Sequence, residues 1–265
     1  MPHATVNGIR LFHTDGGTGA PVLFLHGWGT SGRAWDAQVA DLETDHRVVT
    51  VDWRGCGRSD RPATGNTLAA NVADILALMD VLALDGALLV GSSIGAAYAL
   101  EAAIQAPDRV AGVVSVDGSG HWPTLGMADT LRAMRTSLAT DRAATLAGWV
   151  PEWFGPDADP DLAAETIRQI HRSGTHIDEL LTDAASHDPR ETLGLLRVPA
   201  LFVHGLLDSQ IPVEVSGELA ALAPHGELHV IEDAGHMPHQ ERPAAVNALL
   251  RTALARAVAA PGPSA

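Results

Sequence analysis

The sequence contains no lysine, because all 17 of its basic residues are arginine. Schiff-base enzymes need a lysine amine, and P-loop and protein kinase sites need a lysine charge, so these classes are excluded. Cysteine is almost absent as well. The single Cys56 can form no disulfide within the chain and cannot build a thiolate metal site alone. A reducing, cytoplasmic location fits this cysteine usage.

Long apolar runs and positive charge are also scarce. The sequence has no apolar stretch of the roughly 20 residues that a membrane helix requires, and residues 1–8 do not resemble a signal peptide. Acidic residues outnumber basic ones by 32 to 17, which gives a net charge of −15. Because this charge repels polyanions, we expect no nucleic-acid partner, and because the sequence has no long apolar stretch, we expect no membrane partner. We expect a monomer or a homodimer that binds a small molecule.

The chain is 265 residues long, and 46% of its residues are hydrophobic. Short apolar runs alternate with helical stretches, a pattern typical of an α/β fold with a parallel sheet. Asn7-Gly8 between two short runs predicts a hairpin, so the sheet should begin antiparallel. We therefore predict a mostly parallel, eight-stranded sheet with helices on both faces. The expected strands are 4–6, 9–13, 22–25, 48–51, 87–90, 110–116, 200–204 and 228–231.

The alternation stops between residues 118 and 197. This stretch contains helical patterns broken by prolines but no strand-like run, which predicts an inserted helical cap. Residues 1–117 and 198–258 would then form the core domain. The last residues, 259–265, carry no periodicity and are expected to form a flexible tail.

A strand-to-helix junction carries the pattern G-x-S-x-G, in residues Gly91 to Gly95. Glycines at these positions allow a turn sharp enough to expose the hydroxyl of Ser93 above the helix N-terminus. An ordinary tight turn is the alternative interpretation. We predict that Ser93 is a nucleophile.

A second glycine-rich turn, His26-Gly27-Trp28-Gly29, follows an earlier strand. Such a turn can direct the backbone N–H of Trp28 at a developing oxyanion, together with the N–H of Ile94. The alternative is a structural turn with a structural His26.

Two further strand ends supply an acid and a base. Asp208 follows strand 200–204 and His236 follows strand 228–231, so the chain order is Ser93, Asp208, His236. This is the order of an α/β-hydrolase triad. Asp117, at the end of strand 110–116, is the alternative triad acid.

Thirteen histidines raise the possibility of a metal centre, with His236, His239 and Glu241 as candidate ligands. These residues do not lie in the H-E-x-x-H helix that presents two imidazoles on one face. We therefore expect no metal and no cofactor.

The cap is rich in aromatic residues for a chain with only 4% of them. They include Trp122, Trp149 and Trp153, which either pack the cap or line an apolar pocket above Ser93. We assign these tryptophans and Ser92 to the pocket wall, and we expect an uncharged, moderately hydrophobic substrate.

Together these motifs resemble the α/β-hydrolase superfamily over nearly the whole chain, and the loop Asp52–Ser59 is similar to the family's D-x-R-G-x-G-x-S turn. Small bacterial esterases, enol-lactonases and cofactor-free haloperoxidase-like enzymes are the most similar branches. Ser92 departs from the histidine that many relatives have there. The resemblance disfavours dehalogenases and epoxide hydrolases, which carry Asp at the position of Ser93.

The resemblance implies a serine hydrolase that cleaves a carboxylic ester or lactone through an acyl-enzyme. Two alternatives stay open. The same triad can serve a cofactor-free oxygenase, a C–C bond hydrolase or a lyase. The protein can also be a signalling protein that binds its ligand and turns it over slowly.

Overall fold

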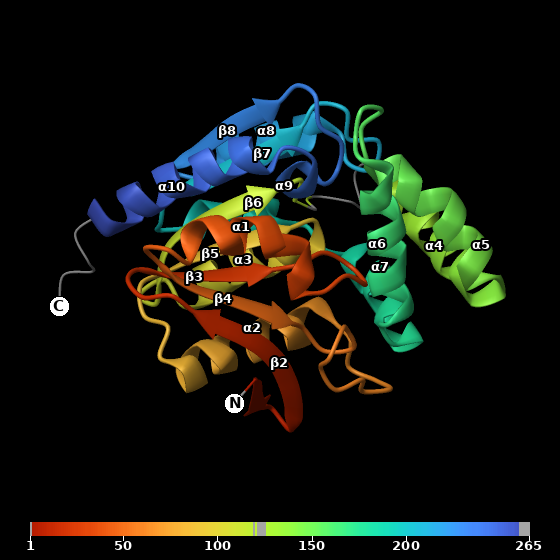
Figure 1. The fold of residues 1–265 in the computed structure, drawn as a ribbon, viewed down its shortest axis with the longest axis horizontal. Helices are drawn as coiled ribbons and strands as arrows, with labels where there is room; N and C mark the ends of the chain where they lie inside the picture. Colours follow the sequence, from red (N-terminus) through yellow and green to blue (C-terminus); the bar gives the residue numbers. More distant parts are fainter. Residues whose placement is uncertain (1, 119, 121–125, 260–265) are drawn as a thin grey trace.

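The computed structural model describes residues 2–118, 120 and 126–259. Eight strands form one sheet in the order β1-β2-β4-β3-β5-β6-β7-β8, as Figure 1 shows. This confirms the predicted α/β fold. The strands are β1 (His3–Val6), β2 (Ile9–Gly16), β3 (Pro21–Leu25), β4 (Arg47–Asp52), β5 (Ala87–Ser92), β6 (Val110–Val116), β7 (Ala200–Gly205) and β8 (Gly226–Ile231).

The sheet begins with the predicted hairpin. Asn7 and Gly8 have φ angles of 48° and 81°, the left-handed values that a tight two-residue hairpin turn requires. β2 also pairs antiparallel with β4, whereas every later neighbouring pair is parallel. The parallel strands therefore end at one common edge.

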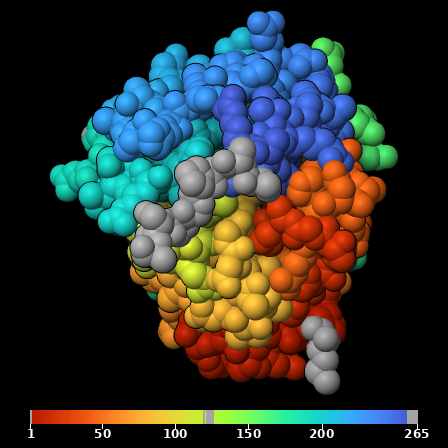
Figure 2. Space-filling model, turned by 90° about the vertical axis from the view of Figure 1, so that its left-hand side faces the viewer, coloured from red at the N-terminus to blue at the C-terminus, as the bar shows by residue number. Residues whose placement is uncertain are grey.

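Helices cover both faces of the sheet, because the central strands are apolar on both sides. Helices α1 (Asp36–Leu42) and α10 (Pro243–Ala259) pack on one face around Phe24 and Trp35. The opposite face carries α2 (Leu68–Leu82), α3 (Ile94–Gln105) and α8 (Val213–Leu222). Figure 2 views the end of the molecule remote from the cap, where the blue C-terminal part lies above the red N-terminal strands.

Between β6 and β7 the described residues form helices and no strand. These helices project beyond the carboxyl edge of the sheet, at the right of Figure 1. The α-helices are α4 (Met127–Thr140), α5 (Arg142–Trp149), α6 (Pro160–His171) and α7 (Glu179–Ala184), and the short 3-10 helices η2 (Val150–Trp153), η3 (Thr175–Asp178), η4 (Pro189–Glu191) and η5 (Leu193–Leu195) join them.

The boundaries of the predicted core and cap stay a prediction. Trp122 and most of the expected tail lie outside the described residues. Within the described part of the chain, no helix combines the length and the apolar character needed to cross a membrane.

Two buried histidines pack against tryptophans in the core. His26 stacks on Trp53 with 4.8 Å between ring centroids, and His239 stacks on Trp35 at 4.2 Å. Burial lowers the pKa of His26 to about 4 and that of His239 to about 3. Both rings are therefore neutral in the folded protein above pH 5.

A close backbone contact joins the ends of β7 and β8. A Cβ atom at Gly205 would lie 2.0 Å from the carbonyl oxygen of Gly235 and 2.5 Å from that of Ala234. Both neighbours are backbone atoms, so no rotamer change can make room. Glycine at position 205 thus lets the two following loops approach each other.

We expect Gly205→Ala to lower the free energy of unfolding by about 2 kcal/mol or more, because overpacking here must move backbone. The matched control is Gly217→Ala in α8, where the nearest atom to the added Cβ is 3.9 Å away. Alanine there should be neutral or stabilising by about 0.5–1 kcal/mol. Urea unfolding of both variants measures the difference, and equal midpoints would contradict the prediction.

We also expect acid to destabilise the fold through His26 and His239. An unfolded histidine binds a proton below about pH 6.5, whereas these rings resist protonation until about pH 4 and 3. Stability is thus lost as the pH falls below 6.5, by up to about 1.4 kcal/mol per pH unit for each ring. Urea unfolding at pH 7.5, 6 and 5 measures this slope.

His239→Phe is the control, since within the described residues neither ring nitrogen of His239 has a hydrogen-bond partner. Phenylalanine keeps the stacking on Trp35 and removes the titrating group, so the slope below pH 6.5 should become shallower. An unchanged slope would exclude His239 as a source of acid sensitivity.

Candidate active site

Ser93 sits on the sharp turn between β5 and α3. Its backbone has φ 54° and ψ −122°, a strained conformation that occurs mostly at functional sites. Glycine is required on both sides: a Cβ at Gly91 would lie 2.1 Å from the carbonyl oxygen of Gly95. The Ser93 N–H donates to the carbonyl of Val116 on β6 at 2.9 Å. The turn is thereby fixed at the carboxyl edge of the sheet.

The loop after β3 passes directly beside Ser93. A Cβ atom at Gly27 would lie 3.5 Å from the Cβ of Ser93. His26 Nδ1 lies 2.8 Å from the carbonyl oxygen of Gly27, and the Thr30 hydroxyl donates to the same oxygen at 3.1 Å. Because Trp53 N–H donates to His26 Nε2 at 3.3 Å, the ring hydrogen is on Nδ1 and Nδ1 is the donor to Gly27. In a planar trans peptide the Gly27 carbonyl and the Trp28 N–H point in opposite directions, so these hydrogen bonds also fix the direction of the Trp28 N–H.

Asp208 and His236 are in direct contact. His236 Nδ1 lies 2.7 Å from Asp208 Oδ2, and the other carboxylate oxygen accepts the N–H groups of Gln210 at 2.7 Å and Ile211 at 3.1 Å. Burial alone would raise the pKa of Asp208, but the charge and hydrogen bond of His236, with those two N–H groups, lower it below its usual value. The ionised carboxylate fixes the imidazole so that Nε2 faces away from it.

Asp117 lies close by in a different arrangement. It is fully buried, has φ 44°, and accepts the Gly205 N–H at 2.9 Å through Oδ1. Burial and the neighbouring charge of Asp208 raise the pKa of Asp117 well above its usual range. His204 Nε2 lies 3.6 Å from Asp117 and 3.5 Å from Asp208. One carboxylate of the pair therefore carries the charge, and the geometry favours Asp208.

Among the described residues, Asp117, Asp208 and His236 are the set of possible metal ligands whose donor atoms come within 4.8 Å of one another. The earlier candidates His239 and Glu241 do not belong to it. Asp208 and His236 of this set already hydrogen-bond each other.

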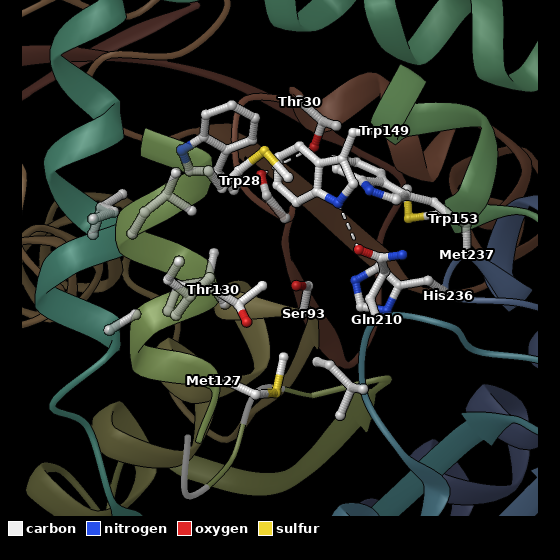
Figure 3. A pocket seen from close by; sticks show the side chains of 18 residues that line it. Trp28, Thr30, Ser93, Met127, Thr130, Trp149, Trp153, Gln210, His236 and Met237 are labelled. Atoms are coloured by element: carbon white, nitrogen blue, oxygen red, sulfur yellow. Dashed lines mark hydrogen bonds between the residues drawn. The ribbon is translucent and has the colours of Figure 1, made fainter. Parts of the chain in front are cut away.

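A pocket of about 820 Å³, part of it open to solvent, lies between Ser93 and the cap. Figure 3 shows Ser93 facing into it, with His236 and Gln210 on one side and the tryptophans above. Carbon and sulfur atoms dominate the lining. The lining residues are Gly27, Trp28, Thr30, Ser93, Ile94, Met127, Thr130, Leu131, Met134, Trp149, Trp153, Leu180, Leu181, Ala184, Gln210, Ile211, His236 and Met237.

The structure places the pocket residues expected from the sequence as follows. Trp149 and Trp153 do line the pocket, and Trp149 Nε1 donates to Gln210 Oε1 at 2.6 Å. Ser92 is not among the residues that line this pocket; it is fully buried behind Gly27, and its assignment to the pocket wall stays a prediction.

From the sequence, Met127 and Met134 are cap residues that either pack the cap or line the pocket, whereas the other lining residues of α4 and α7 were missed. Met127, Leu131 and Met134 recur at spacings of four and three, which places them on one face of a helix. This spacing can be read from the sequence, but it does not show which part of the protein that face of the helix packs against. Gln210 carried no sequence signal, because its role depends on the contact with Trp149.

Comparisons with known proteins agree with the observed fold. The family model described as "alpha/beta hydrolase fold" matches residues 20–243. A non-heme chloroperoxidase of Streptomyces lividans is 31% identical, over 84% of this chain and 92% of its own length. A pimeloyl-acyl-carrier-protein methyl ester esterase of Aliivibrio salmonicida is 28% identical, over 86% of this chain and 89% of its own.

A solved structure, titled "Est816 as an N-Acyl homoserine lactone degrading enzyme", superimposes with a TM-score of 0.85 at 27% identity, and the match covers 95% of this chain and 99% of that one. The relatives thus include esterases, a lactone-degrading enzyme and a peroxidase on one fold. The chain belongs to the α/β-hydrolase family.

Proposed function

We propose that this protein is a serine hydrolase that cleaves a carboxylic ester or lactone of a moderately hydrophobic small molecule through an acyl-enzyme. The observation that carries the proposal is the 2.7 Å contact between His236 Nδ1 and Asp208 beside a pocket that contains Ser93 and His236. A base oriented by a carboxylate and next to a strained serine is the arrangement of a nucleophilic triad.

In the proposed reaction, His236 Nε2 takes the proton of Ser93 as its oxygen attacks the substrate carbonyl. Asp208 stabilises the imidazolium that forms. The N–H groups of Trp28 and Ile94 bind the oxyanion, and each such donor is typically worth about 3 kcal/mol in the transition state. His236 then gives the proton to the leaving alcohol, and water attacks the acyl-enzyme by the same steps in reverse order.

The pocket supports an uncharged substrate. Its lining includes no arginine, aspartate or glutamate, and His236 is its one titratable side chain among the described residues. A charged acyl or alcohol group would lose its hydration without gaining an ionic partner there. Esters and lactones fit equally, since both present a carbonyl carbon with an alkoxide leaving group, and relatives of this chain are named for both.

A second candidate is peroxidase chemistry without a cofactor, which the 31% identical chloroperoxidase favours. Hydrogen peroxide would replace water as the nucleophile that attacks the acyl-enzyme and would release a peracid. This peroxidase chemistry requires the same Ser93 nucleophile, so it differs from hydrolysis only in the step that breaks down the acyl-enzyme.

We expect a fluorophosphonate to label Ser93, and Ser93→Ala to lower kcat for nitrophenyl esters by at least about 10³-fold. Peptide mapping of the labelled protein identifies the site.

Among the nitrophenyl esters, those with neutral acyl chains should be preferred over those whose chains end in a carboxylate. Failure of the folded protein to label would refute the proposed nucleophile, and a burst followed by almost no turnover would favour a slow binding protein.

We expect Asp208→Asn to lower kcat by about 10³–10⁴-fold, because an amide no longer stabilises the imidazolium or its tautomer. Asp117→Asn keeps an oxygen that can accept the Gly205 N–H, so its effect should stay below about tenfold. Steady-state kinetics of the two variants compare these losses. The reverse order would assign the triad acid to Asp117.

A further inference from the structure

Glu241 is a buried acid that the proposed reaction does not use. It ends the short helix α9 (Pro238–Glu241), five positions after His236, and is 8% exposed. Its Oε1 accepts the N–H groups of Gly235 at 3.0 Å and Met237 at 3.3 Å. Its Oε2 accepts the N–H of Gly155 at 2.8 Å. One carboxylate therefore joins the two neighbours of His236 to a segment inserted between β6 and β7.

The same inserted segment also holds His236 itself. The His236 N–H donates to the carbonyl oxygen of Trp153 at 2.6 Å. All three consecutive N–H groups from Gly235 to Met237 are thus bound, two by Glu241 and one by Trp153. The ring of Trp153 lies edge-on to the His236 imidazole, with 6.0 Å between centroids and 76° between planes.

Close approach of the two segments depends on Gly235. A Cβ atom there would lie 2.7 Å from both the Gly155 nitrogen and the Trp153 carbonyl oxygen. These are backbone atoms, which cannot turn aside. The contact is therefore built into the backbone of both segments and does not depend on a flexible side chain.

The loop of Asp208 is tied to the same part of the chain. The Ser209 hydroxyl donates to the carbonyl oxygen of Glu152 at 2.6 Å, and Trp149 donates to Gln210. Both loops that carry the candidate acid and base thus dock on residues 149–155. Glu241 accepts three hydrogen bonds, more than any other side chain of this set makes.

We propose that Glu241 is a positioning residue, which sets the orientation of His236 by fixing its loop to the segment Trp153–Gly155. The inference rests on the proposed function, since it assigns Glu241 a part in the work of His236 as a base. In this proposal the inserted segment has two roles: it lines the pocket, and it holds His236 in the orientation that catalysis requires.

The test compares Glu241→Gln with Asp233→Asn. Glutamine keeps the size of the side chain but replaces one acceptor end with a donor, which opposes an N–H of Gly155, Gly235 or Met237. Asp233 lies in the same loop, its side chain is 66% exposed, and it pairs with Arg242 at 2.6 Å. The control thus removes a nearby carboxylate that does not touch the amides around His236.

We expect Glu241→Gln to lower kcat and the rate of fluorophosphonate labelling by about 10–100-fold per folded molecule, with KM changed less than threefold. Asp233→Asn should match the wild type in all three. Thermal unfolding measures the folded fraction separately. A lower melting temperature with unchanged kcat and labelling rate would make Glu241 a purely structural residue and overturn the inference.

Gly155→Ala covers the case in which Glu241→Gln does not fold. The added Cβ would lie 3.0 Å from Glu241 Oε2, so the carboxyl group must shift by a few tenths of an ångström while the Glu241 side chain itself is unchanged. We expect a two- to tenfold loss of kcat and labelling rate, and no loss would overturn the inference. An unlabelled, inactive wild type would refute the proposed function instead, so the two failures are distinguishable.

Discussion

The parallel pairing of the central strands is the constraint on which the rest of the molecule depends. Parallel pairing delivers the ends of β3, β5, β6, β7 and β8 to one edge of the sheet. Residues as distant in sequence as Gly27, Ser93 and His236 therefore border one pocket. Glycine makes this convergence sterically possible, because a Cβ at Gly91, Gly205 or Gly235 would overlap backbone atoms.

The candidate site contains few ionised groups, and hydrogen bonds orient them. Two carboxyl groups lie side by side at the ends of β6 and β7, and burial leaves room for one negative charge. The geometry favours the charge on Asp208, which three hydrogen-bond donors surround, whereas burial and the neighbouring Asp208 raise the pKa of Asp117. The buried imidazoles of His26 and His204 also have lowered pKa values. Neutral hydrogen-bonding groups and backbone amides thus build most of the site, which agrees with a sequence that has no lysine.

The segment inserted between β6 and β7 has two kinds of contact with the core. Helices α4 and α7 contribute apolar side chains to the pocket, and such a wall can change its composition without altering the reaction. Residues 149–155 instead hydrogen-bond the loops of Asp208 and His236. Trp149 and Trp153 take part in both kinds of contact, since they line the pocket and also hydrogen-bond Gln210 and His236.

The sequence by itself determined the features that are local in the chain. The hairpin at Asn7-Gly8, the eight strands and the turn around Ser93 each depend on neighbouring residues, so short patterns revealed them. Only the tertiary structure decided which carboxylate contacts His236, because Asp117 and Asp208 follow adjacent strands and differ in the direction of their side chains. It also decided that Glu241 meets Gly155, 86 positions away. Contacts between distant segments depend on how the folded surfaces fit, and no periodicity or motif in the sequence encodes that fit.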